Sequence, residues 1–287
     1  MAGRPTWVEF VDPTALRPVV ARPRFGVYIR ELWRRRHFIA LDARARVASS
    51  TKGTFLGSVW LVLRPMLDAL AYFVVFGLLL RADRGIENFL GYLILGVFLF
   101  QYTSGALNAG ASSLIAGRAL LRSFTFPRAA LPLATVARET LRFGPVLVAM
   151  LALIALIPPT EAFTWRVVLL APVLVLQVAM TTGLVLIAAR VVSRVPDVQQ
   201  LIGLGTRFWL YGSAVFFSFD RLIDNPTLLT VVHANPMFRV LDMARDVVLY
   251  GQTPEVDSWL ILSGWTVGLL TFGFWFFWRA EERYARG

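Results

Sequence analysis

Apolar residues gather into six long runs, separated by shorter stretches that contain arginine, proline and glycine. A helix that crosses about 30 Å of hydrocarbon needs about 20 predominantly apolar residues, and each run is close to or above that length. The pattern therefore predicts an all-α membrane protein with six transmembrane helices. The expected spans are Val59 to Leu80, Phe89 to Leu114, Leu133 to Ile157, Val167 to Ala189, Leu201 to Phe219 and Trp259 to Trp278.

The third run carries three charged residues near its start, Arg138, Glu139 and Arg142. A helix over this run is longer than the hydrocarbon core, so its first turns can extend toward the cytoplasm. One interpretation is that the arginines snorkel, with Glu139 and Arg142 paired at spacing i, i+3. The other is a polar element at the inner mouth of a transport pathway, and both stay open.

Residues 25–52 precede the first run and predict an amphipathic helix at the membrane interface. A solvated basic arm is the alternative. Arg36 interrupts the apolar stripe, while Arg30, Arg34 and His37 lie on the opposite face. Residues 1–24 are expected to be a cytoplasmic arm, because they are arginine-containing and lack the apolar core of a signal peptide. The apolar face would carry Phe25, Tyr28, Ile29, Leu32, Ile39 and Ala43.

Residues 220–252 contain two Asn-Pro pairs, Asn225-Pro226 and Asn235-Pro236. Asn is a favoured N-cap and Pro a favoured first helical residue, so two short helices are expected here. Both are too short to span, which predicts re-entrant outer helices, with a simple extracellular loop as the alternative. Gly251 suits the end of the second helix. The polar, solvated face of that helix would carry Arg239, Asp242, Arg245 and Asp246.

Composition and charge agree with a membrane protein. Apolar residues make up 57% of the chain and the mean hydropathy is +0.62, whereas soluble domains have about 45–50% apolar residues. The net charge of +11 could suggest nucleic acid as a partner, but arginine and lysine concentrate in the segments on one side of the six runs. This asymmetry predicts that both termini are cytoplasmic, and anionic lipids explain the basicity without DNA or RNA.

Residues that could perform catalysis are scarce. Cysteine is absent, and the two histidines, His37 and His233, are expected on opposite sides of the membrane, so a metal or a catalytic histidine pair is not expected. Outer carboxylates could suit a lipid-linked sugar transferase, but they form no close acidic pair and alternate with arginines. The chain is therefore expected to be no enzyme and to hold no cofactor.

The single lysine, Lys52, excludes a P-loop, because its neighbours do not form the glycine-rich phosphate-binding motif. If ATP drives transport, the ATPase must be another polypeptide that docks on this chain. Residues 116–128 lie on the arginine-rich side and are the expected coupling segment, although an elbow that packs on its own bundle is the alternative. Its contact residues would be Gly117, Arg118, Leu120, Leu121, Arg122, Phe124 and Phe126, ended by Pro127.

These residues resemble the permease subunit of ABC-2 type polysaccharide exporters, the O-antigen and teichoic-acid exporter family. Four stretches carry the likeness in order, from about Phe25 to the tail. One departure is Gly117, where the family often has Asn, and residues before Phe25 fall outside the resemblance. The stretches are SSLIAGRALLRSFTFPRAALPL from Ser112, TFLGSVWLVLRPM from Thr54, RVPDVQQL from Arg194, and NPMFRVLDMARDVVLYG from Asn235.

The resemblance implies a homodimer of six-span permeases in the bacterial inner membrane, bound to two cytosolic ABC ATPase subunits that use ATP and magnesium. Residues 117–126 would be the coupling helix, and the outer helices would be gate helices with Asn225, Pro226, Asn235, Pro236, Arg239 and Asp242. Spans 1 and 5 would line the channel. The cargo would be a lipid-linked polysaccharide, and the arginine-rich composition together with the likeness suggests an actinobacterial galactan.

A polymer cannot fit into one alternating pocket, so short ATP-driven steps along a channel are expected, with weak and repeated contacts. Aromatic faces can stack against sugars, although lipid contact in an aromatic belt is the alternative for each ring. Two other functions stay open: an ABC-2 permease for a small lipid or drug, and a self-contained carrier or enzyme. The candidate channel-lining aromatics are Trp60, Tyr72, Phe76, Phe208, Trp209, Tyr211 and Phe216.

Overall fold

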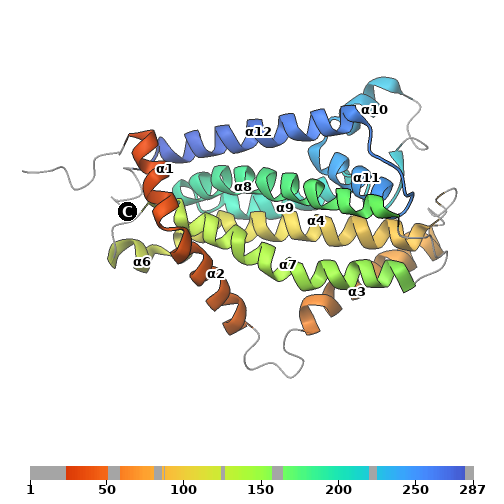
Figure 1. Cartoon of the computed structure of the whole chain (residues 1–287), viewed down its shortest axis with the longest axis horizontal. Helices are drawn as coiled ribbons and strands as arrows, with labels where there is room; N and C mark the ends of the chain where they lie inside the picture. The colour runs from red at the N-terminus through yellow and green to blue at the C-terminus, as the bar shows by residue number, and fades with distance from the viewer. Residues whose placement is uncertain are drawn as a thin grey trace, which may run out of the picture.

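The computed structural model describes residues 24–50, 59–80, 86, 88–123, 127–156, 164–219 and 225–281. These residues form helices joined by turns, and they contain no strand. The long helices lie side by side as one bundle (Figure 1). The prediction of an all-α fold is therefore confirmed for the described part of the chain.

Among the described residues, five helices are long and apolar enough to cross a membrane. They match five of the six expected spans, with shifts of a few residues at the ends. The helices are α3 (Val59–Tyr72) continued by the π-helix η1 (Phe73–Leu79), α4 (Phe89–Ala111), α7 (Ala130–Leu156), η2 (Trp165–Leu169) continued by α8 (Leu170–Arg194), and α12 (Val256–Trp278).

The remaining expected span, Leu201 to Phe219, is wrong in its outer part. Helix α9 (Val198–Tyr211) has 14 residues, or about 21 Å, and the chain then continues through turns. The turns are stable because other helices satisfy their carbonyl groups. The Tyr92 hydroxyl donates to the carbonyls of Ala214 at 2.8 Å and Phe217 at 3.1 Å. Ala214 has a positive φ of 54°, which a continuous helix would not allow.

Shorter helices lie at the two ends of the bundle. One end carries α1 (Phe25–Arg34), α2 (Arg36–Ser50), α5 (Ser113–Ala116) and α6 (Arg118–Ser123), and the other carries α10 (Pro226–His233) and α11 (Pro236–Val248). Figure 1 shows that α6 and α11 lie at opposite ends of the long axis. This placement agrees with a coupling segment and outer helices on opposite sides of the membrane.

The N-terminal segment is not the single helix that its pattern predicts, because α1 and α2 are separated by a turn at Arg35. Tyr28, Leu32 and Ala43 are buried as expected. Phe25 and Ile29, by contrast, are exposed. The turn rotates the second half of the apolar stripe, so one face of α2 packs against α7.

A buried carboxylate joins three segments near α1. Glu281 accepts hydrogen bonds from the Tyr28 hydroxyl at 2.9 Å and from the backbone N–H of Arg128 at 3.0 Å. The Arg128 guanidinium donates to the Glu281 carbonyl, and burial raises the pKa of the Glu281 carboxyl above its usual range. Helix α1, the residues just before α7 and the residues after α12 are therefore held together at one point.

Candidate functional site

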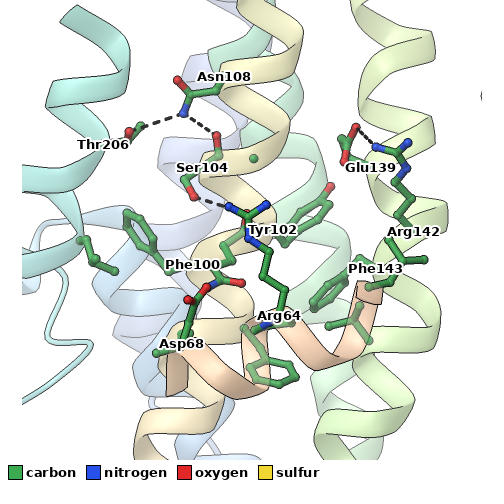
Figure 2. Close-up of a pocket in the computed structure, with 18 of the residues that line it drawn as sticks. Arg64, Asp68, Phe100, Tyr102, Ser104, Asn108, Glu139, Arg142, Phe143 and Thr206 are labelled. Carbon is green, nitrogen blue, oxygen red and sulfur yellow. Dashed lines mark hydrogen bonds and ion pairs between the residues drawn. The ribbon is translucent and has the colours of Figure 1, made fainter. Parts of the chain in front are cut away.

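An open cleft of about 880 Å³ lies between α3, α4, α7 and α9. This is within the size range of about 300–1,000 Å³ that ligand pockets usually have. Figure 2 shows α3 crossing in front of α4, with side chains from α7 on one side and α9 on the other. Residues of predicted spans 1 and 5 therefore do share one cleft, together with residues of α4 and α7.

Helix α3 brings two opposite charges into the cleft one turn apart, Arg64 and Asp68. Asp68 accepts a hydrogen bond from the side-chain amide of Gln101 at 2.8 Å. Arg64 extends toward the space beside Tyr102 and Ser104 (Figure 2), and it makes no hydrogen bond or ion pair with any other residue that the structure describes. Neither residue was predicted as a site residue, because both lie within the apolar run of span 1.

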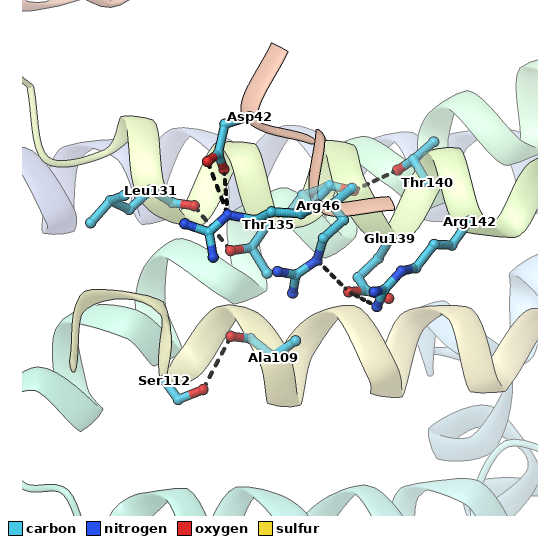
Figure 3. A network of polar contacts seen from close by, with 11 residues as sticks. Asp42, Arg46, Ala109, Ser112, Leu131, Thr135, Glu139, Thr140 and Arg142 are labelled. Carbon is cyan, nitrogen blue, oxygen red and sulfur yellow. Dashed lines mark hydrogen bonds and ion pairs between the residues drawn. The ribbon is translucent and has the colours of Figure 1, made fainter. Parts of the chain in front are cut away.

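Helix α7 contributes Arg138, Glu139 and Arg142, for which the sequence allowed either snorkelling or a polar element of a transport pathway. Glu139 accepts from Arg138 at 3.0 Å and from Arg142 at 3.2 Å, so the predicted i, i+3 pair is confirmed. Figure 3 shows the Glu139–Arg142 pair on α7, near the Asp42–Arg46 ion pair of α2. Glu139 and Arg142 also line the cleft. The Nε of Arg142 is buried and has no hydrogen-bond partner.

Helix α4 supplies uncharged polar groups, Gln101, Ser104 and Asn108, at helical spacing. The Asn108 amide donates to the Ser104 carbonyl at 2.8 Å and lies 3.5 Å from the hydroxyl of Thr206 on α9. The Gln199 amide donates to the Asn108 carbonyl at 3.1 Å, which connects α9 to α4 a second time. Polar residues three and four apart within an apolar run were the signal that sequence reasoning missed.

Two of the seven predicted channel aromatics, Trp60 and Tyr72, line the cleft. Phe208 and Tyr211 are 70% and 48% exposed on α9, outside the cleft lining. Phe76 stacks on the buried ring of Phe216 at 4.5 Å between centroids, and Trp209 packs edge-on against Phe100. Some of these rings therefore line the cleft, some are exposed on α9 and some pack against other rings. A common aromatic track stays a prediction.

The segment predicted to couple to an ATPase, residues 116–128, begins at the end of α5 and continues through a turn at Gly117 into α6, so that α5 and α6 form an elbow. A β-carbon at Gly117 would require the end of the Leu131 side chain to shift. Arg118 is exposed, whereas Leu120 and Leu121 are half-buried against the chain's own cluster around Tyr28 and Leu131. The two leucines therefore favour the alternative of an elbow packed on its own bundle.

Other parts of that segment are only partly described. Pro127 is buried directly before α7. Arg122 lies in α6, but its side chain is outside the described part of the structure, and Phe124 and Phe126 lie outside the described residues. The docking role of these residues remains a prediction.

The two outer helices begin as their Asn-Pro pairs predict. Asn225 accepts from Thr227 N at 2.9 Å, Asn235 accepts from Met237 N at 3.0 Å, and Pro226 and Pro236 are the first residues of α10 and α11. Gly251 has a φ of +59° shortly after α11, as expected for a helix end.

Asn235 also connects α11 to the end of α9. Its side-chain oxygen accepts from the Trp209 indole at 2.9 Å, and its amide donates to the Gly212 carbonyl at 2.8 Å and the Ser213 hydroxyl at 3.1 Å. All four hydrogen-bonding positions of this amide are used once the cap of α11 is included. The short α9 helix and the outer helices therefore form one connected unit.

Arg239 and Asp242, the predicted charged gate residues, lie on α11 one turn apart, 3.9 Å from each other. The Arg239 guanidinium donates to the His233 carbonyl at 2.7 Å and to the Ser258 hydroxyl at 3.0 Å. Arg239 therefore connects α10, α11 and α12. Whether these residues act as a gate stays a prediction.

Arg245 corrects the prediction that it lies on a solvated face of α11, because it is only 3% exposed. Its guanidinium lies 3.3 Å from the centre of the Tyr92 ring and donates to the Ala214 carbonyl at 2.9 Å. Burial lowers the pKa of Arg245 below its usual range. The arginine is buried because the turn after α9 presents carbonyl groups that need donors, a demand that the local pattern of α11 cannot show.

Asp246 on α11 gives a pH-dependent prediction. Burial, together with the charges of Asp242 and Glu255, raises the pKa of Asp246 to about 6. An unfolded aspartate has a pKa of about 3.9, so the stability contributed by the protonated carboxyl is present at low pH and is lost as the pH rises through about 6. Asp246→Asn is neutral at every pH and is therefore expected to raise the unfolding temperature at about pH 7.5 but not at about pH 4.

The control is Asp257→Asn, which removes an exposed carboxylate from the first turn of α12. This change should not raise the unfolding temperature at either pH. Equal unfolding temperatures for Asp246→Asn and the unchanged chain at neutral pH would contradict the prediction.

Comparisons with known proteins agree with this architecture. A family model described as "ABC-2 type transporter" matches residues 42–249. The "O-antigen export system permease protein RfbA" of Myxococcus xanthus is 25% identical over 242 residues, which cover 84% of this chain and 92% of that protein. Two Klebsiella pneumoniae proteins of the same name are 27% and 25% identical, covering 70% and 77% of this chain and 75% and 85% of their own lengths.

The family match extends from α2 to just past α11 and so includes the cleft, the elbow and the outer helices. The relatives are named as permeases, which are transport components and not enzymes. With five apolar helices long enough to cross a membrane, the protein is a multi-pass membrane protein. Since the matched model covers most of its length, this chain belongs to the ABC-2 type transporter family.

Proposed function

We propose that this chain is the membrane subunit of an ATP-driven exporter that moves a lipid-linked polysaccharide from the cytoplasm across the bacterial inner membrane. The observation that carries the proposal is the open cleft between α3 and α9, whose walls combine aromatic rings with amide, hydroxyl and charged groups. Sugars present both hydroxyl groups and apolar C–H faces, so this mixture suits them. The family match and the names of the relatives support the same function.

The proposed topology has six crossings with both termini in the cytoplasm. In Figure 1, α9 runs from the end that carries α6 toward the end that carries α10 and α11. Helix α9 and the turns at 212–218 would together form the missing crossing, with their carbonyls satisfied by Tyr92 and Arg245. The arginine asymmetry supports a cytoplasmic position for the α6 end.

In the proposed assembly, two copies of this chain bind two copies of a cytosolic ABC ATPase, which supply ATP and magnesium chemistry. The elbow at α5 and α6 would receive the ATPase through Arg118 and the residues that follow it. Glu281 holds Arg128, just before α7, to Tyr28 and to the end of α12. A movement of the elbow would therefore reach α1, α7 and α12 together.

Galactan is the specific polysaccharide proposed as the cargo. This choice depends on the family resemblance and on the arginine-rich composition of the sequence. The cleft supports the broader class of hydroxyl-rich ligands. Export of a small lipid or drug, and transport without an ATPase, are the competing outcomes that an experiment must separate.

The first test purifies the tagged chain from cells that also produce an untagged ABC ATPase, and measures glycan in cells that lack the chain. We expect the ATPase to co-purify and a lipid-linked glycan to accumulate on the cytoplasmic side when the chain is missing. Accumulation of a small amphiphile without any glycan would contradict the proposed cargo. Transport by the isolated chain without ATPase would contradict the proposed mechanism.

The docking role is tested by Arg118→Glu, with Arg44→Glu as the control because Arg44 is also an exposed arginine, on α2. Reversing a charge at the docking surface should weaken ATPase binding about tenfold, equivalent to about 1.4 kcal/mol, and reduce export in parallel. The control should bind and export normally. Normal ATPase binding and export by Arg118→Glu would place the docking surface elsewhere.

A further inference from the structure

Five charged residues line the cleft, namely Arg64, Asp68, Glu139, Arg142 and Arg207. Asp68 is hydrogen-bonded to Gln101, and Glu139 is paired with Arg142. Arg64 and Arg207 differ, since neither forms a hydrogen bond or an ion pair with another residue in the described part of the chain. Two cations without a partner therefore line the same cleft from α3 and α9.

An arginine within the membrane is costly unless it is paired or reaches water, so an unpaired arginine there indicates a functional site. Arg64 lies within a span, and it extends into the cleft between α4 and α7 (Figure 2). Arg207 is exposed and lines the same cleft from α9. The cleft therefore offers several guanidinium N–H donors that the chain itself does not use.

Guanidinium groups bind phosphate oxygens especially well, because their planar N–H donors match two oxygens at once. The other cleft residues suit a hydroxyl-rich neighbour of that anion: Gln101 and Asn108 provide amides, and Trp60 and Tyr72 provide rings. An isolated inorganic anion would not use the Trp60 and Tyr72 rings. The combination fits a phosphate group joined directly to a sugar.

We propose that Arg64 and Arg207 bind the phosphate group that joins the first sugar of the cargo to its lipid. Gln101 and Asn108 contact the hydroxyl groups of that sugar. This inference rests on the proposed function and assigns the cleft to the lipid-linked end of the cargo. The same phosphate chemistry occurs in membrane phospholipid headgroups, so the experiment must separate these two sources.

The test uses the full chain in nanodiscs of phosphatidylcholine and measures binding of three probes. The first is a disaccharide joined to a short alkyl chain through diphosphate, the second is the same disaccharide joined through a neutral glycosidic bond, and the third is phosphatidylglycerol. The variants are Arg64→Gln and Arg207→Gln, with Arg194→Gln as the control because Arg194 is exposed and lies outside the cleft.

We expect the dissociation constant of the diphosphate probe to rise about tenfold for each cleft variant, which corresponds to about 1.4 kcal/mol. Binding of the other two probes should not change, and the control should bind all three normally. Inorganic diphosphate should also displace the diphosphate probe from the unchanged chain, a measurement that does not depend on folding of a variant.

Three results would overturn the inference: unchanged affinity in both cleft variants, an equal loss for the neutral probe, or an equal loss for phosphatidylglycerol, which would assign the arginines to membrane lipid. Failure of the proposed function is distinguishable, because the unchanged chain would then neither export glycan in cells nor bind either glycan probe. If the unchanged chain exports glycan and the cleft variants also bind and export normally, the proposed function is retained and only the phosphate site is wrong.

Discussion

Gly183→Val is expected to destabilise the chain severely and to lower the yield of folded protein. Helices α8 and α12 lie in close contact at Gly183, where a β-carbon would lie 2.5 Å from the backbone carbonyl of Leu269. Gly273 faces the same contact, since its β-carbon would lie 2.5 Å from the Gly183 carbonyl oxygen. Backbone atoms cannot rotate away as a side-chain end can, so the two helices would have to separate.

We expect the loss of stability to reach about 3 kcal/mol or more, at the upper end of the cost of overpacking, because two long helices lose their contact together. The measurement is the yield of monodisperse protein after detergent extraction and the unfolding temperature of what remains. Small residues commonly allow membrane helices to pack this closely.

The matched control is Gly268→Ala on α12, where an added β-carbon meets no atom within 4 Å. This variant should be obtained in normal yield with an unchanged or slightly higher unfolding temperature. Normal yield of Gly183→Val would show that α8 and α12 are not packed as described.

Arg245→Ala is expected to have the second largest effect on stability. The substitution removes one donor to the Ala214 carbonyl and the cation over the Tyr92 ring, both in a fully buried setting. The Ala214 carbonyl keeps the Tyr92 hydroxyl as a donor, so the substitution costs the hydrogen bond from a charged group, about 1.5–3 kcal/mol, and the lost packing adds to this value. We therefore expect a loss of about 3 kcal/mol, concentrated in the turn after α9 and in α11.

The experiment compares unfolding temperatures and protease sensitivity of Arg245→Ala, Arg245→Lys and Arg194→Ala. Lysine keeps the charge but loses the planar fork, so Arg245→Lys should recover only part of the stability. Arg194→Ala changes an exposed arginine and should stay within about 0.5 kcal/mol of the unchanged chain. New cleavage sites are expected near residues 212–218 in Arg245→Ala alone. Equal stability of Arg245→Ala and Arg194→Ala would contradict the anchoring role.

Hydrogen bonds from Asn235 and Arg245 explain why α9 ends at Tyr211 and the chain continues as turns. Asn235 takes the Gly212 carbonyl and Arg245 takes the Ala214 carbonyl, so the turn needs no helical partners. A change in either residue affects α9 and α11 together. In the proposed exporter, α9 lines the cleft, so the outer helices and the cleft are mechanically connected.

The sequence predicted much of the fold because the deciding signals are local. Five spans follow from continuous apolar length, and α10 and α11 follow from Asn-Pro pairs whose hydrogen bonds lie within a few residues. The Glu139–Arg142 pair was predictable for the same reason, since helical spacing alone brings the two side chains together. The cleft was predicted only in outline, as a space between spans 1 and 5.

The sequence by itself determined the helical content, the five long spans, the capped outer helices and the missing nucleotide-binding motif. Only the tertiary structure decided where α9 ends, why Arg245 is buried, and which polar residues of α3, α4, α7 and α9 line one cleft. The physical reason is that these features depend on the rotation of each helix and on donors from distant helices. Apolar periodicity cannot encode them, because a helix in a membrane is apolar on its lipid-facing side as well as on its packed side.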